Sequence, residues 1–479
     1  MQLTRYKRNG ITLWPQKWEL KLKPAPMWDD RTPMILITFD GLGDRPSSEL
    51  DNQTPLQAAH TPNLDELTRI GISGIHQPFG PGRATSSERS HWAMFGQTQT
   101  FPGRALLEAI GMGIDIPAER PHFHLALRPA ILEGGQLRAV GRVSKDDASD
   151  CLELFDALRV MPHKLNPVLH PLRNGECILE SAVISSQEIS DSDPLFGHIH
   201  PVLQPLALES ALDQQSAKES AELVTSWINS AVELLIAHPI NKARRSAGKL
   251  ELIAPVTKWA SKKTELKTFE QATGLTGAAV TSSALYRGLA EVLGMTQIHI
   301  PSDLDNVQAD LEARIAAGLE LSKTHSFVHI HTKATDEAGH TKQPKLKRDV
   351  IESLDRACHN LSKHAETTTI VITGDHATPS TGGIMHSAHP TSLILAGPHV
   401  FPDEVNQCEE SSHRNGELGK VMASDILPLM SHYSHRASFK GHATGSSETI
   451  ALPDNPVALD FSETKNMNQL SKVNGTGIK

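Results

Sequence analysis

The feature that most constrains the fold is a set of short apolar, β-branched runs, each followed at once by polar residues capable of chemistry. The run PMILITF at 33–39 leads into Asp40, and the run TTTIVIT at 367–373 leads into Asp375 and His376. Similar runs are SFVHIHT at 326–332, TSLILAG at 391–397 and MTQIHIP at 295–301. Runs of this kind predict buried strands of a mostly parallel sheet. Ligands of such sheets gather at the carboxyl ends of the strands, where these polar residues fall.

Helical patterns lie between the predicted strands. Residues 62–70 place Leu64, Leu67 and Ile70 on one face, and residues 282–293 repeat this spacing. Alternation of buried strands with amphipathic helices predicts an α/β fold.

The middle of the chain, from about 118 to 270, has a different pattern. Gly134 and Gly135 predict a hairpin, and a long amphipathic helix is expected to end before Pro239. Its buried stripe is expected to comprise Leu223, Val224, Trp227, Ile228, Ala231, Leu234 and Leu235. We therefore predict an inserted α+β domain at 118–270, a core made of 31–117 and 271–479, and an N-terminal extension at 1–30.

Composition limits the kind of protein. With 38% hydrophobic and 21% charged residues among 479, the chain is expected to fold, and its net charge of −9 argues against nucleic acid or membrane as a partner. The four scattered cysteines predict neither a disulfide framework nor a thiolate metal site. The chain has no apolar run of 18 residues and no signal-peptide core near its first residues, so the cytoplasm is the expected location. Nothing in the sequence indicates an oligomeric state.

Acids and histidines cluster at the predicted strand ends. Asp336 and His340 stand four residues apart, which on a helical turn places both side chains on one face. With Asp40, Asp375, His376 and His386 they make three carboxylates and three imidazoles, too many for one tetrahedral site. Nitrogen and oxygen donors without thiolate indicate two divalent ions, Mn or Zn, with Mg less suited to imidazole. Taken alone, each residue would more often be an ordinary loop acid or surface histidine, but all six together at the ends of predicted strands are not easily explained that way.

A serine-rich stretch at 84–96, ATSSERSHWAMFG, raises the question of a nucleophile. Ser86 or Ser87 could simply cap a helix, with Glu88 near the positive end of its dipole. The same serines could instead attack a substrate, given an activating group.

From about Pro33 to Lys440 the sequence resembles the archaeal type of cofactor-independent phosphoglycerate mutases, in the alkaline phosphatase superfamily. The matching stretches are FDGLGDRP, TPLQAAHTPNLDELTRIG, GRALLEAIGMGI, SDSDP, GLTGAAV, KATDEAGH and TGDHATP. The resemblance implies an alkaline phosphatase-like core with two divalent metals and an inserted lid that binds a small phosphorylated metabolite.

The family's Ser-acid-x-x-His motif falls on residues 87–91, which makes Ser87 the expected catalytic nucleophile, activated by a metal. By the same resemblance Asp336, His340 and His386 would hold one ion, and Asp40, Ser87, Asp375 and His376 the other. The residues expected to bind the substrate are Arg104, Arg138, Arg142, Asp191, Lys258 and Lys333.

The lid departs from the family pattern at several places. Residues 123–127 read FHLAL where the family has Phe-Arg-x-Asn-Phe, and one arginine is lost before Arg142. Leu195 replaces a histidine, and residues 257–261 (TKWAS, with Trp259) replace a glycine-rich turn. Further along, His413 replaces a cysteine, and Lys420 and Met422 replace an arginine pair. Loss of groups that clamp carboxylate or phosphate suggests a shifted substrate.

The expected reaction is the glycolytic interconversion of 3-phosphoglycerate and 2-phosphoglycerate through a phosphoserine. Two alternatives stay open: a metal-dependent phosphatase or phosphonate hydrolase acting on another small anion, and a catalytically silent scaffold. The complete ligand set argues against the scaffold.

Overall fold

The computed structural model describes residues 6–8, 11–13, 29–118, 120–172, 175–194, 200–437 and 449–460. Residues Met1–Arg31 form a unit of their own, in which β1 (Tyr6–Arg8) pairs antiparallel with β2 (Ile11–Leu13). All elements below belong to the unit Thr32–Lys479.

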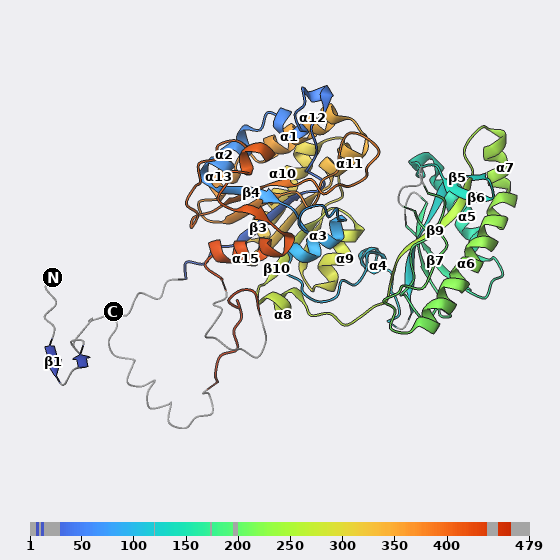
Figure 1. The fold of residues 1–479 in the computed structure, drawn as a ribbon, viewed down its shortest axis with the longest axis horizontal. Coiled ribbons are helices and arrows are strands. Elements are labelled where there is room, and N and C mark those ends of the chain that lie inside the picture. Colours follow the sequence, from blue (N-terminus) through green and yellow to red (C-terminus); the bar gives the residue numbers. More distant parts are fainter. Residues whose placement is uncertain are drawn as a thin grey trace. The chain divides into compact units, whose positions relative to one another are not determined.

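An eight-stranded sheet organises the larger part of this unit (Figure 1). Its strands, in the order β11-β10-β12-β3-β13-β14-β4-β15, are β3 (Met34–Phe39), β4 (Ile72–His76), β10 (Gly277–Thr281), β11 (Thr296–His299), β12 (Phe327–Thr332), β13 (Thr369–Thr373), β14 (Thr391–Ala396) and β15 (Gly419–Val421). Neighbouring strands run parallel except where β14 pairs with β13 and with β4. The α/β fold with a mostly parallel sheet is confirmed.

One expectation about this sheet is wrong. The run at 295–301 was expected to form a buried strand, but β11 lies at the end of the strand order and its residues are half-buried or exposed. An edge strand borders only one neighbour, so apolar, β-branched residues there are not enclosed on both sides.

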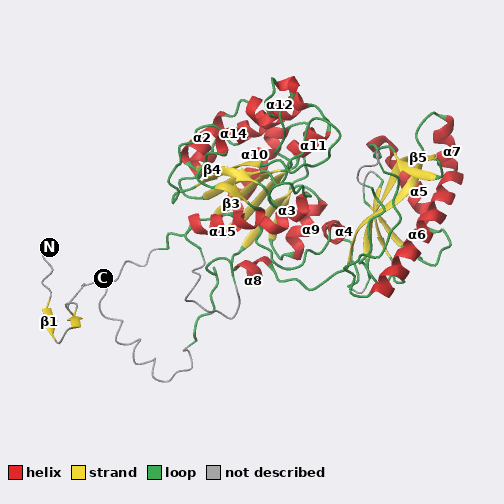
Figure 2. Cartoon of the chain, viewed as in Figure 1, coloured by secondary structure: helices red, strands yellow, loops and turns green. Residues whose placement is uncertain are grey.

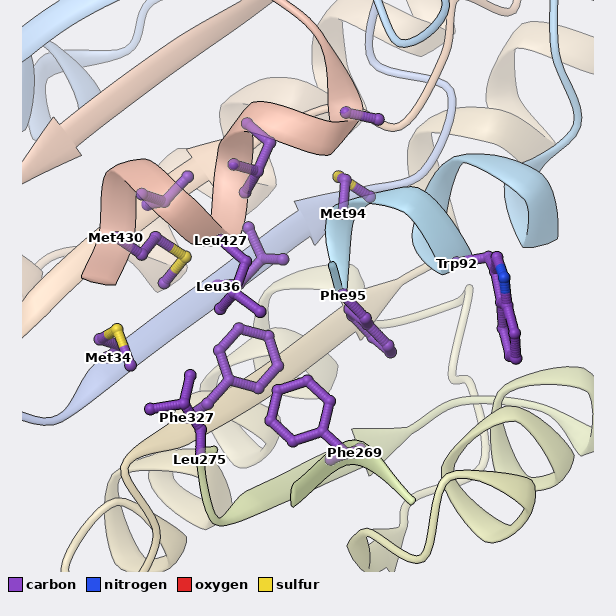
Figure 3. Packing of buried hydrophobic residues seen from close by; sticks show 14 of the residues in the cluster. Met34, Leu36, Trp92, Met94, Phe95, Phe269, Leu275, Phe327, Leu427 and Met430 are labelled. Atoms are coloured by element: carbon purple, nitrogen blue, oxygen red, sulfur yellow. The ribbon is translucent and has the colours of Figure 1, made fainter. Parts of the chain in front are cut away.

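Helices cover both faces of the sheet because successive strand residues point in opposite directions. Met34 and Leu36 of β3 join one core cluster, with Phe95, Phe269 and Met430 (Figure 3). Ile35 and Ile37 join a second cluster on the other face. The helices are α1 (Pro55–Ala58), α2 (Pro62–Ile70), α3 (Ser87–Met94), α4 (Arg104–Gly111), α8 (Phe269–Thr273), α9 (Ala284–Val292), α10 (Val307–Leu321), α11 (Ala334–His340), α12 (Pro344–Ala357), α13 (Leu361–His364), α14 (Glu410–His413) and α15 (Ala423–Tyr433), with a 3-10 turn at Ser48–Leu50.

A five-stranded antiparallel sheet is built from residues 122–261, inside the predicted insertion (Figure 2). It comprises β5 (His122–Glu133), β6 (Gln136–Ala139), β7 (Val168–Pro171), β8 (Glu176–Glu180) and β9 (Leu252–Ser261). The predicted hairpin joins β5 to β6, with φ of 58° at Gly134 and 76° at Gly135. Its helices are α5 (Ala148–Arg159), α6 (Gln214–Ala237) and α7 (Pro239–Ser246), with a 3-10 turn at Lys145–Asp147. We call residues 118–270 the lid.

Helix α6 ends before Pro239 as predicted, and most of its apolar stripe is buried in a third core cluster, with Leu223 and Leu234 half-buried. Among the described residues, no single helix is long and apolar enough to span a membrane. Helices α6 and α7 reach that length and composition only as a pair bent by 55°, and the stripe of α6 packs against the lid sheet.

Candidate active site

Three adjacent strands bring the predicted ligands together. β12, β3 and β13 run parallel side by side, so the residues that follow them meet at one edge of the sheet. Nε2 of His376, after β13, lies 3.2 Å from Oδ1 of Asp40, after β3. In α11, after β12, Nε2 of His340 lies 3.2 Å from Oδ1 of Asp336. The imidazole of His386 stacks on that of His376, with ring centroids 3.9 Å apart.

The first turn of α3 places Ser87 against these groups. Its Oγ lies 2.9 Å from Nε2 of His376 and donates to Oδ1 of Asp40 at 3.2 Å. Ser86 is the N-cap residue, but its hydroxyl donates to Glu88 at 2.6 Å and makes no capping bond. Of the adjacent pair, Ser87 is therefore the serine that faces the candidate ligands.

In each of two residue groups here, one ligand atom per residue lies within 4.8 Å of the others: Asp336, His340 and His386 form one group, and Asp40, Asp336 and His376 form the other. Asp336 belongs to both groups. Asp375 was expected in the second group. Its ligand atoms lie in neither of these two groups: Oδ1 accepts the amide N–H of Gly41, while the buried Oδ2 makes no hydrogen bond and lies 3.6 Å from both Nε2 of His376 and Nδ1 of His91. A buried carboxylate oxygen that accepts no hydrogen bond and lies beside imidazole nitrogens is an arrangement that suits divalent cations.

The pKa shifts of the buried carboxylates also indicate a cation site. Burial would raise the pKa of Asp40, but the ammonium of Lys333 and hydrogen bonds from His331 and His376 hold it well below its ordinary value. Burial and the charge of Asp40 instead raise the pKa of Asp375 to about 7. Several buried carboxylates in one place repel one another, and a bound cation removes that repulsion.

A tight backbone approach makes this packing possible. Gly41 has a φ of +65°, and a Cβ there would come within 2.4 Å of Oγ1 of Thr378 and 2.9 Å of Oδ1 of Asp336. Only glycine suits this position, because other residues would collide with a candidate ligand and are strained at positive φ.

Some residues that hold Asp40 in place were not predicted from the sequence. Nε2 of His331 contacts Oδ2 of Asp40 at 3.1 Å, while Oγ of Ser282 lies 2.6 Å from its Nδ1. The hydroxyl of Tyr286 donates to the same carboxylate at 3.3 Å. His331 is the last histidine of an apolar run, and that polar position inside a buried strand was the available signal.

Two of the expected substrate-binding residues lie near the candidate ligands and the serine motif. Nζ of Lys333 lies 3.1 Å from Asp336 and 3.6 Å from Asp40, beside the candidate ligands. Arg104, at the start of α4, pairs with Glu88, the residue after Ser87, at 3.3 Å, and with Glu108 at 2.9 Å.

In the lid, Trp259 contacts Arg104 and two further residues of the expected set. The guanidinium of Arg104 lies over its indole, 4.4 Å from the ring centroid, and Nζ of Lys258 lies 4.1 Å from it. Oδ1 of Asp191 accepts the Trp259 amide N–H at 2.8 Å, and Trp259 itself has a φ of +55°. Such strain is typical of ligand-binding segments.

The remaining predicted residues lie apart from this cluster. Arg142 is exposed and reaches Sδ of Met385, the neighbour of His386, at 3.7 Å. Arg138 contacts Gln136 and Glu133 in its own hairpin.

The other residues that depart from the family pattern differ in how far they are buried. His413 is buried, with its ring 2.5 Å from the hydroxyl of Ser392, whereas Lys420 and Met422 are exposed. Leu195 lies outside the described residues.

Comparison with known proteins places this geometry in a class. Residues 32–433 match the family model of the Metalloenzyme superfamily. The chain is 32% identical to the 2,3-bisphosphoglycerate-independent phosphoglycerate mutase 2 of Methanocaldococcus jannaschii, over 88% of this chain and 97% of that one. It is 31% identical to the 2,3-bisphosphoglycerate-independent phosphoglycerate mutase of Pyrococcus horikoshii, over 84% and 97%.

Solved structures of related proteins also match this chain. A protein structure from Pyrococcus horikoshii matches with a TM-score of 0.67 and 28% identity, over 86% of this chain and 99% of that one. The cofactor-independent phosphoglycerate mutase of Thermoplasma acidophilum matches with a TM-score of 0.54 and 28% identity, over 84% and 100%. The chain is thus a metalloenzyme by class. It belongs to the family of 2,3-bisphosphoglycerate-independent phosphoglycerate mutases, which confirms the resemblance read from its motifs.

Proposed function

We propose that this enzyme interconverts 3-phosphoglycerate and 2-phosphoglycerate by phosphoryl transfer through Ser87, with two divalent ions, Mn or Zn. The observation that carries the proposal is the position of the Ser87 hydroxyl, in contact with both Asp40 and His376 at the candidate ligand cluster. Membership of the family supports the choice of substrate.

The donors present suit the ions. Asp336, His340 and His386 would hold one ion, and Asp40, Ser87, Asp375 and His376 the other. When bound, the ions would supply positive charge to the attacking and leaving oxygens and lower the pKa of the Ser87 hydroxyl.

The chain's own residues carry the two half-reactions. Oγ of Ser87 attacks phosphorus, the bond from phosphorus to the C3 oxygen breaks, and the hydroxyl proton of Ser87 passes to the departing glycerate alcohol. The C2 hydroxyl of the retained glycerate then attacks the phosphoseryl group, and its proton returns to Ser87 Oγ. Between these steps the lid excludes water, which would otherwise hydrolyse the phosphoserine.

Cationic side chains would hold the substrate anions. Lys333 lies beside the candidate ligands, while the guanidinium of Arg104 and the ammonium of Lys258 both lie over the indole of Trp259. Arg138, Arg142 and Asp191 complete the proposed set.

Hydrolysis is the second candidate, favoured by one observation. Lys258 and Trp259 occupy the segment where the family has a glycine-rich turn, so the lid end of the site is reshaped. A screen of phosphorylated metabolites with Mn²⁺ or Zn²⁺, scoring isomerised product against free phosphate, separates the two. Isomerisation of phosphoglycerate supports the mutase, and phosphate release from another ester alone refutes it.

Replacing Arg104 with alanine is expected to lower kcat/KM for phosphoglycerate by roughly ten- to a hundredfold, since a charge-assisted bond to an anion contributes about 1.5 to 3 kcal/mol. Steady-state kinetics give the value. The matched control is Arg89→Ala, on the exposed face of α3, which should change kcat/KM little. Equal effects of the two substitutions would contradict a role for Arg104 in binding.

The lowered pKa of Lys258 leads us to expect that kcat/KM depends on pH. Burial and the charge of Arg128 lower its pKa to about 8, against the opposing pull of Asp193 and Glu176. Because the cation binds the substrate anion, kcat/KM is expected to fall as pH rises above about 8. In Lys258→Arg the side chain stays charged and this fall should disappear. Coincident pH profiles of the two enzymes would show that Lys258 does not bind the substrate as a cation.

A further inference from the structure

A buried lysine lies behind the candidate ligands. Lys347, in the first turns of α12, has a fully buried side chain. Its Nζ donates to the carbonyl oxygens of Gly41 at 2.8 Å, Gly43 at 3.0 Å and Thr378 at 2.8 Å. An ammonium has three N–H donors, so these carbonyls match its full capacity.

The charge on Lys347 has a partner. Oδ2 of Asp44 lies 3.1 Å from Nζ, and Asp44 also accepts the amide N–H of Ser380. Burial lowers the pKa of Lys347, while Asp44 opposes this by favouring the charged form. A buried ammonium with a carboxylate and three carbonyls is well compensated, whereas its removal leaves buried acceptors unpaired.

The carbonyls that Lys347 joins come from the two loops that carry candidate ligands. Gly41 and Gly43 follow Asp40, at the end of β3. Thr378 follows His376 by two residues, after β13. These loops also bond to each other, through the amide N–H of Thr378 and the carbonyl of Gly43 at 3.0 Å. The ammonium therefore holds both loops at one point.

Thr378 extends this connection to α11, the helix that follows β12. Its hydroxyl donates to Oδ1 of Asp336 at 2.6 Å and lies 3.2 Å from Nδ1 of His376. A shift of Thr378 would therefore move a carboxylate and an imidazole of the candidate metal site together.

We infer that Lys347 is a positioning residue that fixes the separation of the Asp40 loop and the His376 loop and thereby sets the affinity for divalent metal. The inference rests on the proposed function, because it treats these residues as ligands. Groups that orient ligands contribute 10- to 100-fold to metal affinity in other proteins.

The test compares Mn²⁺ affinity among variants of the full chain after chelation, measured by loss of the free Mn²⁺ signal in electron paramagnetic resonance. Lys347→Met, which fills the space but donates no hydrogen bond, is expected to raise the Kd by 10- to 100-fold. Lys347→Gln keeps two N–H donors and should recover part of this loss. The matched control is Lys345→Met, two residues away on α12 and exposed, which should bind as wild type does.

An unchanged Kd in a folded Lys347→Met protein, or in Lys347→Gln if the methionine variant does not fold, would overturn the inference. A purely structural role would lower the melting temperature of the metal-free protein without changing the Kd. Failure of the proposed function is a separate result: wild-type protein that binds Mn²⁺ but isomerises no phosphoglycerate refutes the mutase and leaves the Kd comparison intact.

Discussion

Replacing Ser87 with alanine is expected to abolish turnover, by roughly 10⁴-fold or more, because the attacking oxygen is lost. The substitution removes one hydroxyl from a buried position, so the fold should persist and most of the metal should remain bound. Intact-mass measurement after exposure to substrate is expected to detect one added phosphoryl group on the wild-type protein, mapped to Ser87, and none on the variant.

Two neighbouring serines provide matched controls for this result. Ser86 bonds to Glu88, and Ser90 is buried with no hydrogen-bond partner for its hydroxyl. Ser86→Ala and Ser90→Ala should both keep most of the activity. If Ser86→Ala is the inactive variant, the nucleophile has been assigned to the wrong serine.

Replacing Asp336 with asparagine is expected to lower both metal content and activity strongly, since Asp336 contributes to both ligand groups. Its Oδ1 lies 3.2 Å from Nε2 of His340 and 3.7 Å from Nε2 of His386. A neutral amide at this position is therefore expected to weaken metal binding by the group that contains both histidines. Elemental analysis of the purified protein should find up to two divalent ions per wild-type chain and fewer in the variant.

Chelation of the wild-type enzyme is the control for this prediction. Exhaustive removal of divalent ions should stop wild-type turnover, and Mn²⁺ or Zn²⁺ should restore it. Full activity after chelation would contradict metal dependence, and full metal content in Asp336→Asn would contradict the ligand role of that residue.

The sheet was predictable from local sequence because buried strands need continuous apolar runs. β3, β12 and β13 coincide with such runs, and the residues at their ends meet because parallel neighbours place their carboxyl ends together. The α/β fold and the family are confirmed. The metal-binding and catalytic roles of Asp40, Ser87 and Asp336 stay predictions, which the substitutions above test.

The residues that support the site were not predictable in the same way. Lys347 contacts carbonyls that lie 31 to 306 positions away in the chain, and a lysine in an amphipathic helix ordinarily faces solvent. Tyr286 reaches Asp40 across 246 positions. Such contacts depend on tertiary packing, which no local pattern encodes. Exposed β11 was misjudged for a related reason, because strand order is not visible in a single run.

The central claim is that Ser87 passes the phosphoryl group back to glycerate and not to water. Phosphorus-31 nuclear magnetic resonance resolves 3-phosphoglycerate, 2-phosphoglycerate and inorganic phosphate in one spectrum. With chelated enzyme resupplied with Mn²⁺ or Zn²⁺, the account predicts that 3-phosphoglycerate converts to a stable mixture with 2-phosphoglycerate and little free phosphate. A spectrum in which inorganic phosphate grows without 2-phosphoglycerate, or in which 3-phosphoglycerate persists while another small ester is hydrolysed, would contradict it.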